Sequence, residues 1–251
     1  MELTDLPIFK KIPDGLRNGR SIRDGYARGW GLQFGDLKAK VAADPLYCEA
    51  LALAQERTVQ SEENRMNQFL LVKFYLSKLP EGHIVEFGSF RGGSAIFMAK
   101  LCAELLPKTR VYAFDTFQGM PETDASIDAH SKNDFSGVDF EELQDYVSSL
   151  KLNNLHLVRG LFEDTAPAAL IKISKIRMSH IDCDIRSGVL YSYDVCKPFM
   201  VQGGYTVLDD ALYSSCLGAT EVVEDIMIRR DGLNSEQIYP HFVFRANETG
   251  E

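Results

Sequence analysis

The stretch VEFGSFRGGS (Val85–Ser94) decides the fold of this chain. The apolar residues that open it have the pattern of a buried strand, and residues 95–106 after it have that of a helix. Gly88, Gly92 and Gly93 give the spacing GxxxGG, which differs from the dinucleotide-binding GxGxxG. Glycines let a ligand approach the backbone closely, and the following helix directs its N-terminus at the same point. The stretch therefore predicts a ligand-binding strand, loop and helix.

An acid, Glu86, stands two positions before the first of these glycines. A carboxylate at the charged end of a ligand repels pyrophosphate but attracts an ammonium or sulfonium group, so the predicted ligand carries positive charge. The polar loop residues Ser89, Arg91 and Ser94 belong to the same predicted binding set. The alternative is a tight strand-to-helix turn in which Glu86 is solvated.

Asp115 ends the next predicted strand, RVYAFD, about 20 residues after the glycines. An acid at this place can accept hydrogen bonds from both hydroxyls of a ribose. The glycine loop, the ribose acid and a positively charged ligand end together point to S-adenosylmethionine, with Thr116 as a further contact. The alternative for Asp115 is a helix N-cap or an Asx-turn.

Two more acidic pairs follow predicted strands: Asp182 with Asp184 after IRMSHI, and Asp209 with Asp210 after GYTVL. If the strands are sheet neighbours, the four carboxylates converge and raise each other's pKa, and a bound divalent cation relieves the repulsion. Oxygen ligands favour Mg²⁺, Mn²⁺ or Ca²⁺ over zinc. If the strand persists, Asp182 and Asp184 share a face, and one can hold metal while the other faces substrate. The alternative is that Asp209 and Asp210 cap the next helix and Asp184 is solvated.

Two histidines are weighed as proton acceptors. His180 lies in the strand before Asp182, where it is either a hydrogen-bonded structural residue or a second candidate for the catalytic base after Asp184. His130 lies in a polar stretch, Gln118–Gly137, which is too long for an ordinary connection and is predicted to be a functional flap. It can reach substrate from there or simply be exposed.

Composition narrows the class of partner. The chain has 251 residues and a formal charge of −9, which argues against a nucleic acid as the main partner because phosphate binding needs clustered Lys and Arg. Neither a signal core nor a run of membrane-spanning length is present, so a soluble, cytoplasmic protein without a membrane partner is expected. The five cysteines form no CxxC pair and are expected to be free thiols.

Strand and helix patterns alternate over most of the chain, which predicts a single α/β domain with a mainly parallel sheet, helices on both faces and an N-terminal helical cap. Residues 57–251 are the predicted cofactor-binding and catalytic core. Residues 1–56 are the predicted cap, lid or oligomer contact, with Trp30 and Phe34 as apolar anchors. Residues 237–246 read as one final strand.

Five motifs resemble the macrocin O-methyltransferase family: VEFGSFRGGSAIFMA, VYAFDTFQGMP, GLFEDTAP, HIDCD and GGYTVLDD. They span roughly residues 57–213, and FDTFQGMP and the pairing HIDxD…GGxxxxDD are the most specific. The resemblance implies a Rossmann-like class I methyltransferase that depends on a metal and acts mainly on sugar hydroxyls of natural products. It also fits a homo-oligomer, a dimer or higher.

The resemblance also implies roles for the second acidic region. Asp182, Asp209 and Asp210 match the metal ligands, Asp182 also matches a cofactor contact, and Asp184 matches the general base. Arg186 stands where relatives often have an aromatic residue, and the flap matches no substrate type, so the acceptor stays open.

For the cofactor, the resemblance implies that Glu86 and Asp115 contact the amino-acid end and the ribose. Phe162 and Glu163 fall near the adenine pocket. Thr58–Val59 matches a segment that folds over bound cofactor.

The predicted reaction is methyl transfer from S-adenosylmethionine to a hydroxyl of a small molecule, which is expected to be a sugar or glycosylated natural product. A metal ion lowers the pKa of the hydroxyl, and Asp184 takes its proton. Two alternatives remain: a catechol-type O-methyltransferase, and a catalytically degenerate cofactor-binding subunit.

Overall fold

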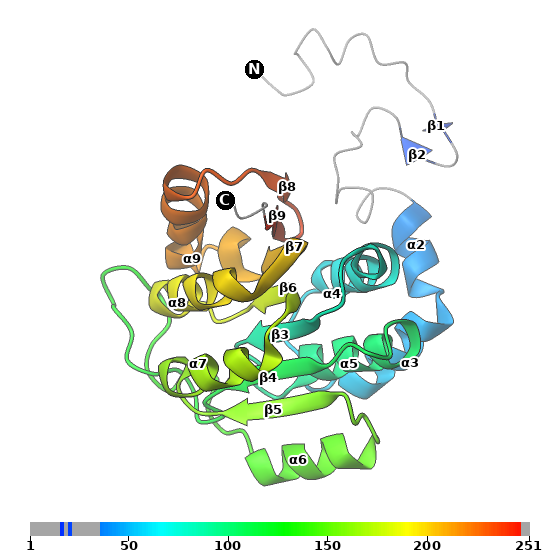
Figure 1. Cartoon of the computed structure of the whole chain (residues 1–251), viewed down its shortest axis with the longest axis horizontal. Helices are drawn as coiled ribbons and strands as arrows, with labels where there is room; N and C mark the ends of the chain where they lie inside the picture. The colour runs from blue at the N-terminus through cyan, green and yellow to red at the C-terminus, as the bar shows by residue number, and fades with distance from the viewer. Residues whose placement is uncertain (1–15, 18–19, 22–35, 247–251) are drawn as a thin grey trace, which may run out of the picture.

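The computed structural model describes residues 16–17, 20–21 and 36–246, and its centre is a seven-stranded sheet (Figure 1). The strand order is β5-β4-β3-β6-β7-β9-β8. Five strands are parallel: β3 (His83–Phe87), β4 (Val111–Asp115), β5 (Leu155–Arg159), β6 (Ile176–Ile181) and β7 (Met200–Leu208). The strands β8 (Ser235–Gln237) and β9 (Phe242–Arg245) form an antiparallel edge. The predicted mainly parallel sheet is confirmed, but the single final strand is wrong, because the chain turns back between β8 and β9.

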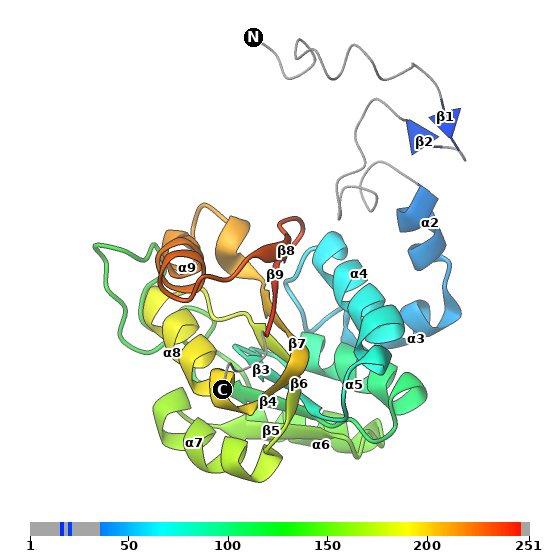
Figure 2. The ribbon, with the colours of Figure 1, turned by 45° about the horizontal axis from the view of Figure 1, so that its top comes forward.

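Helices cover both faces of the sheet (Figures 1 and 2). One face carries α3 (Pro45–Ala54), α4 (Glu62–Leu70), α5 (Gly93–Leu105) and α6 (Phe140–Ser149). The other carries α7 (Phe162–Ile173), α8 (Arg186–Cys196), α9 (Leu217–Glu221) and the π-helical η7 (Val222–Arg230). Among the described residues, the remaining elements are α2 (Asp36–Ala42), the helical turns η3 (Leu71–Tyr75), η4 (Leu76–Lys78), η5 (Lys197–Phe199) and η6 (Asp210–Leu212), and the short pair β1 (Leu16–Arg17) and β2 (Arg20–Ser21).

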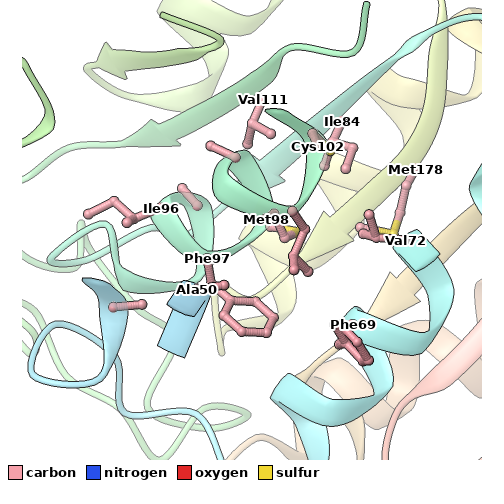
Figure 3. Packing of buried hydrophobic residues seen from close by; sticks show 14 of the residues in the cluster. Ala50, Phe69, Val72, Ile84, Ile96, Phe97, Met98, Cys102, Val111 and Met178 are labelled. Atoms are coloured by element: carbon pink, nitrogen blue, oxygen red, sulfur yellow. The ribbon is translucent and has the colours of Figure 1, made fainter. Parts of the chain in front are cut away.

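Alternation along β3 explains why both faces are apolar. Ile84 belongs to the core under α3, α4 and α5, whereas Val85 and Phe87 belong to the core under α7 and α8. Figure 3 shows part of the first core, in which Phe97 of α5 points toward the N-terminal helices that carry Ala50 and Phe69. Successive side chains of a strand point to opposite faces, so a strand that is buried on both faces reads as a continuous apolar run.

The segment predicted as an N-terminal helical cap contains α2 and α3, and α3 packs on the core beside α4, while its role as cap, lid or oligomer contact stays a prediction. The Tyr47 ring on α3 meets the rings of Phe69 and Phe97 edge-on at 5.5 and 5.6 Å. Asp44 caps α3 and Ser61 caps α4, each through its side chain. Trp30 and Phe34 lie outside the described residues. Of the helices that the structure describes, none is long and apolar enough to cross a membrane.

Strand register places the predicted site residues at one edge of the sheet. Phe87 pairs with Phe114 and with Ile181, and Ile181 pairs with Leu208. The residues that follow these four positions therefore leave the sheet side by side, at the carboxyl ends of β3, β4, β6 and β7. Ligands of open α/β sheets bind at such an edge, where the strand order reverses on either side of β3.

Candidate active site

A cavity of about 290 Å³ opens at the carboxyl edge of the sheet. Its wall contains most of the predicted cofactor, metal and base residues: Thr58, Val59, Gly88, Ser89, Ser94, Asp115, Thr116, Phe162, Glu163, Asp182, Asp184, Asp209 and Asp210. The structure thus brings together residues from five strand ends and from the segment before α4. Glu86, Arg91 and His180, which were predicted to belong to the same site, are not part of this wall.

The glycines of the loop serve backbone packing as well as ligand access. Gly88 has a φ of 89°, and a Cβ on it would lie 1.7 Å from the carbonyl oxygen of Asp182. A Cβ on Gly93 would lie 2.6 Å from the carbonyl carbon of Arg57. The first close approach is thus between the ends of β3 and β6, and the second holds the segment Arg57–Gln60 against the loop. The sequence predicted close approach at these glycines but assigned it to a ligand.

Glu86 lies beneath the loop rather than in the cavity. Its side chain is fully buried, and its carboxylate accepts a hydrogen bond from the Ser89 hydroxyl at 2.6 Å and contacts His180 Nδ1 at 3.1 Å. The solvated alternative is therefore wrong, whereas direct contact of Glu86 with a ligand stays a prediction. Arg91 is exposed, with its guanidinium 4.9 Å from the Phe90 ring centroid.

Asp115 holds the glycine loop in place. Its Oδ2 accepts hydrogen bonds from the backbone N–H groups of Ser89 and Phe90, both at 2.8 Å, and its Oδ1 accepts from Phe117 N at 2.6 Å. The bond to Phe117 is the Asx-turn that the sequence left open. The Thr116 hydroxyl also lies 3.5 Å from Oδ1, but its single proton is donated to the Gly119 carbonyl at 2.7 Å. Each carboxylate oxygen accepts two hydrogen bonds, so Oδ1 keeps capacity for one donor in the cavity. Burial raises the pKa of Asp115, and the backbone hydrogen bonds oppose that shift.

Three carboxylates form a cluster at the ends of β6 and β7. One oxygen each of Asp182, Asp209 and Asp210 lies within 4.8 Å of the other two. Burial and then the charges of neighbouring carboxylates raise the pKa of Asp182 and of Asp210 well above the usual range. Burial alone would raise the pKa of Asp209 too, but the two histidines beside it outweigh burial and hold its pKa below the ordinary value.

A polar shell around Asp209 has no counterpart in the sequence-based prediction. Its Oδ1 contacts Gln60 Nε2 at 2.6 Å and His241 Nε2 at 2.7 Å, and its Oδ2 accepts from Asn64 Nδ2 at 2.9 Å. Asn64 lies in the first turn of α4, Gln60 lies two residues before α4, and His241 directly precedes β9. The helix α4 and the strand β9 lie side by side in Figures 1 and 2. No local signal in the sequence tied Gln60, Asn64 or His241 to the acids.

Hydrogen bonds assign the proton of His241. Gln237 Nε2 donates to the Tyr239 carbonyl at 3.0 Å and to Asn67 Oδ1 at 2.9 Å, which fixes the orientation of both amides. Asn67 Nδ2 then faces His241 Nδ1 at 2.9 Å as a donor. The imidazole proton is therefore on Nε2 and is donated to Asp209. Burial lowers the pKa of His241, which agrees with a neutral ring.

Asp184 lines the cavity from the loop after β6 rather than from a continued strand. The strand β6 ends at Ile181, and Asp184 has a φ of 60°, so the condition for a shared face, a strand that persists to Asp184, is not met. Its backbone N–H donates to Asp210 Oδ2 at 2.8 Å, which ties it to the cluster. Its Oδ1 lies 3.5 Å from both His130 Nε2 and Cys216 Sγ. Burial raises the pKa of Asp184, and His130 and Cys216 oppose the shift.

Of the two histidines considered as proton acceptors, His180 is buried outside the cavity and His130 lines it. His180 is fully buried, with Nδ1 3.1 Å from Glu86 Oε1 and Nε2 3.3 Å from Asp209 Oδ1, so it fits the structural alternative rather than that of a base. Burial lowers its pKa, but the two carboxylates dominate and raise it to about 9. His130 of the flap lines the cavity beside Asp184, and its Nδ1 contacts Asp134 Oδ2 at 3.3 Å.

The carboxylate cluster suits a hard divalent cation. Its donors are all oxygens, and burial together with the neighbouring carboxylates raises the pKa of Asp182 and of Asp210, so a cation there would relieve both effects. The Oε1 of Gln60 is also buried beside them with no hydrogen-bond partner among the described residues. An all-oxygen site of this kind fits Mg²⁺, Mn²⁺ or Ca²⁺.

Comparison with solved structures identifies the fold. The O-methyltransferase NovP aligns with a TM-score of 0.63 at 21% identity, over 84% of this chain and all of its own. The calicheamicin methyltransferase CalS11 aligns with a TM-score of 0.63 at 17% identity, over 92% of this chain and 99% of its own. The predicted Rossmann-like class I methyltransferase fold is confirmed.

Comparison of sequences identifies the family. An 8-demethyl-8-(2,3-dimethoxy-alpha-L-rhamnosyl)-tetracenomycin-C 4'-O-methyltransferase of Streptomyces olivaceus is 30% identical over 148 residues, which are 55% of this chain. The match spans 56% of that relative's length. The model of the macrocin-O-methyltransferase (TylF) family matches residues 62–231, more than half of the chain. The chain therefore belongs to the macrocin O-methyltransferase family.

Proposed function

We propose that this protein is an S-adenosylmethionine-dependent, divalent-metal-dependent O-methyltransferase that acts on a hydroxyl of a small molecule, a sugar or a glycosylated natural product. The observation that carries the proposal is one cavity that joins the glycine loop and Asp115 to the cluster of Asp182, Asp209 and Asp210. Membership of the family and the similarity to a methyltransferase named for a rhamnosyl substrate support the class of acceptor.

The cofactor would lie between the glycine loop and α7. Asp115 Oδ1 has the remaining capacity for one ribose hydroxyl, fewer than the two expected from the sequence. Phe162, at the start of α7, meets Phe87 edge-on at 5.1 Å and offers a fixed apolar surface for the adenine, next to Glu163. Val59 lines the cavity although it is 73% exposed, which suits a side chain that gains cover from a bound ligand.

Asp182, Asp209 and Asp210 would hold the cation. When bound, a divalent cation lowers the pKa of a chelated hydroxyl. The surrounding residues orient the ligands: His241 and Asn64 donate to Asp209, and the backbone of Asp184 donates to Asp210. Such supporting contacts fix the direction of a carboxylate before an ion arrives.

Asp184 is the proposed general base. Its carboxylate lines the cavity next to the cluster, and burial raises its pKa toward the range in which a carboxylate accepts a proton at neutral pH. His130 contacts it from the flap at 3.5 Å and would hold it in place. Much of the rate acceleration would come from alignment of the acceptor oxygen with the sulfonium methyl group. Several buried acids around the cavity also favour a cationic cofactor over its neutral product.

The test is transfer of a labelled methyl group from S-adenosylmethionine to panels of hydroxylated glycosides and catechols. We expect product with glycosides, loss of activity with EDTA, and recovery with Mg²⁺ or Mn²⁺. Turnover of catechols alone would favour the catechol-type alternative. Tight S-adenosylmethionine binding without turnover on any acceptor would support a degenerate subunit, and full activity after rigorous chelation would refute the metal.

A further inference from the structure

The side chain of Gln60 reaches into the carboxylate cluster from the segment between α3 and α4. Its Nε2 lies 2.6 Å from Asp209 Oδ1 and 3.2 Å from Asp182 Oδ2. The residue is 8% exposed, and its Oε1 is buried without a hydrogen-bond partner among the residues that the structure describes. The amide nitrogen thus lies within hydrogen-bond distance of both acids and 3.3 Å from His180 Nε2, while the amide oxygen is unused.

This arrangement suits a cluster without a cation, because the amide nitrogen donates to carboxylates that would otherwise repel each other. A rotation of 180° about the last side-chain bond exchanges the nitrogen and oxygen of a glutamine at almost no change in shape. After that rotation the oxygen stands where the nitrogen was, facing both Asp182 and Asp209. A cation between the carboxylates repels the N–H groups and attracts the oxygen, so its arrival favours the rotated state.

The distances match those between neighbouring ligands of one ion. Oxygens bound to an octahedral cation at about 2.1 Å lie roughly 3 Å apart when they are adjacent. The Gln60 position is 2.6 and 3.2 Å from one oxygen of each of two acids, which brackets that value. Resting on the proposed metal-dependent function, we infer that Gln60 Oε1 is a fourth protein ligand of the divalent cation, beside Asp182, Asp209 and Asp210.

The main chain of Gln60 is well placed for this role. Its N–H donates to Thr58 Oγ1 at 3.1 Å, its carbonyl accepts from the Arg65 guanidinium, and Ser61 caps α4 directly after it. The backbone is therefore anchored while the terminal amide is the part that turns. Since Thr58 and Val59 line the cavity where the cofactor is proposed to bind, the same short segment would serve both ligands.

The test is Mn²⁺ binding, followed by the electron paramagnetic resonance signal of the free ion, for the full chain and for Gln60→Met. Methionine keeps the length of the side chain but supplies no oxygen ligand. We expect affinity to fall about ten-fold or more, as for loss of groups that support a bound metal. Gln144→Met, on the exposed side of α6, is the matched control and should bind Mn²⁺ like the wild type. If Gln60 only neutralises the empty cluster, Gln60→Met would bind Mn²⁺ equally or more tightly, which overturns the inference.

Two further variants distinguish the loss of a metal ligand from misfolding of Gln60→Met. Gln60→Ala should weaken Mn²⁺ binding in the same direction, and Gln60→Glu should restore at least wild-type affinity because it supplies carboxylate oxygens at the same reach. A folded Gln60→Glu that binds as weakly as Gln60→Met overturns the ligand role. Thermal unfolding and S-adenosylhomocysteine binding verify folding in each case. A wild type without saturable Mn²⁺ binding removes the metal from the proposed function as well, whereas unchanged binding in Gln60→Met removes Gln60 alone.

Discussion

At the scale of single residues, neighbours rather than residue type decide what each aspartate does. Asp209 and Asp210 are adjacent and both buried, yet the pKa of Asp209 is lowered and that of Asp210 is raised. Asp209 lies against two histidines and two amides, whereas Asp210 faces the carboxylates of Asp184 and Asp209. A cation would therefore relieve more repulsion at Asp210, whereas hydrogen bonds already fix the orientation of the Asp209 carboxylate.

Asp115→Ala should weaken binding of S-adenosylhomocysteine by roughly 10- to 100-fold, equivalent to about 1.5–3 kcal/mol for a hydrogen bond to a charged acceptor. The variant removes the proposed ribose acceptor and also the bonds that hold Ser89 and Phe90. Calorimetric titration measures the affinity. Asp145→Ala, on the exposed side of α6, is the control. Wild-type affinity in a folded Asp115→Ala would exclude Asp115 from the site.

Asp182 and Asp184 should respond differently to added metal. We expect Asp182→Asn to lower metal affinity and to regain turnover in part when Mg²⁺ is raised. We expect Asp184→Asn to bind metal and cofactor nearly normally but to lose about 10²- to 10⁴-fold in rate, as for removal of a general base. Steady-state kinetics over a range of Mg²⁺ concentration separates the two. An identical metal response would make Asp184 another ligand, and His130, beside it at 3.5 Å, would be the next candidate base.

At the scale of elements, two segments without strands or long helices form the cavity's outer wall. Arg57 joins the segment before α4 to α6, through an ion pair to Glu142 at 2.5 Å and a stack over the Tyr146 ring at 3.9 Å. Within the flap, the backbone N–H of Met120 donates a hydrogen bond to the carbonyl of Asp134 at 2.8 Å and links the two ends of the flap. Asp128, buried in the flap, accepts from the backbone of Arg186 at 2.9 Å and anchors the flap to α8.

Hydrogen exchange should fall in residues 57–60 and 118–137 when S-adenosylhomocysteine and Mg²⁺ bind. These segments line the cavity and carry few regular backbone hydrogen bonds, so ligand contacts add protection that the fold does not supply. Mass spectrometry of deuterated peptides, with and without ligands, gives the measurement. The core strand β3 serves as the internal reference. Equal exchange in both states would reduce the two segments to passive loops.

Asp231 should make stability depend on pH through the contact between α8 and η7. Its carboxylate accepts from Tyr193 at 2.7 Å and pairs with Lys197 and Arg230 at 2.7 and 2.8 Å. Arg230, with further help from Lys197 and Tyr193, holds the pKa of Asp231 below its ordinary value of 3.8. A lowered pKa contributes stability above the unfolded pKa, and the contribution is lost as pH falls through the folded value.

For Asp231→Asn we therefore expect a loss of about 1–2 kcal/mol in the free energy of unfolding at pH 7. The difference from the wild type should shrink as the pH drops below 4. Urea unfolding at several pH values, with Asp145→Asn as the exposed control, measures it. A difference that grows toward acid would contradict the assignment.

At the scale of the whole molecule, one core supports the cavity from the face away from α7 and α8. Phe97 is fully buried in it, and its ring packs edge-on against the Tyr47 ring of α3. Because α5 begins at the glycine loop, the packing of Phe97 also sets the position of that loop. The homo-oligomer expected from the sequence stays a prediction, which sedimentation analysis can test.

Phe97→Ala should lower the free energy of unfolding by about 3–5 kcal/mol, the range for removal of a fully buried phenylalanine. Phe74→Ala is the matched control: this ring is 49% exposed, so its loss should cost under about 1 kcal/mol. Urea unfolding followed by fluorescence compares the two. Similar losses in both variants would mean that the core does not depend on Phe97.

The sequence by itself determined the sheet, the order of its helices and the acids at its strand ends, because these depend on periodicity within a few residues. Asp115, Asp182, Asp209 and Asp210 could be chosen in this way, and all four line one cavity. Patterns were weaker where the chain reverses, so the turn between β8 and β9 was missed.

Only the tertiary structure decided which of these residues meet. Gln60, Asn64 and His241 surround Asp209 although they lie far from it along the chain, because α4 and β9 pack next to the end of β7. A local sequence pattern cannot predict such a contact, because the contact depends on strand order and on helix packing. The same holds for Glu86, which points beneath the loop to His180 rather than into the cavity.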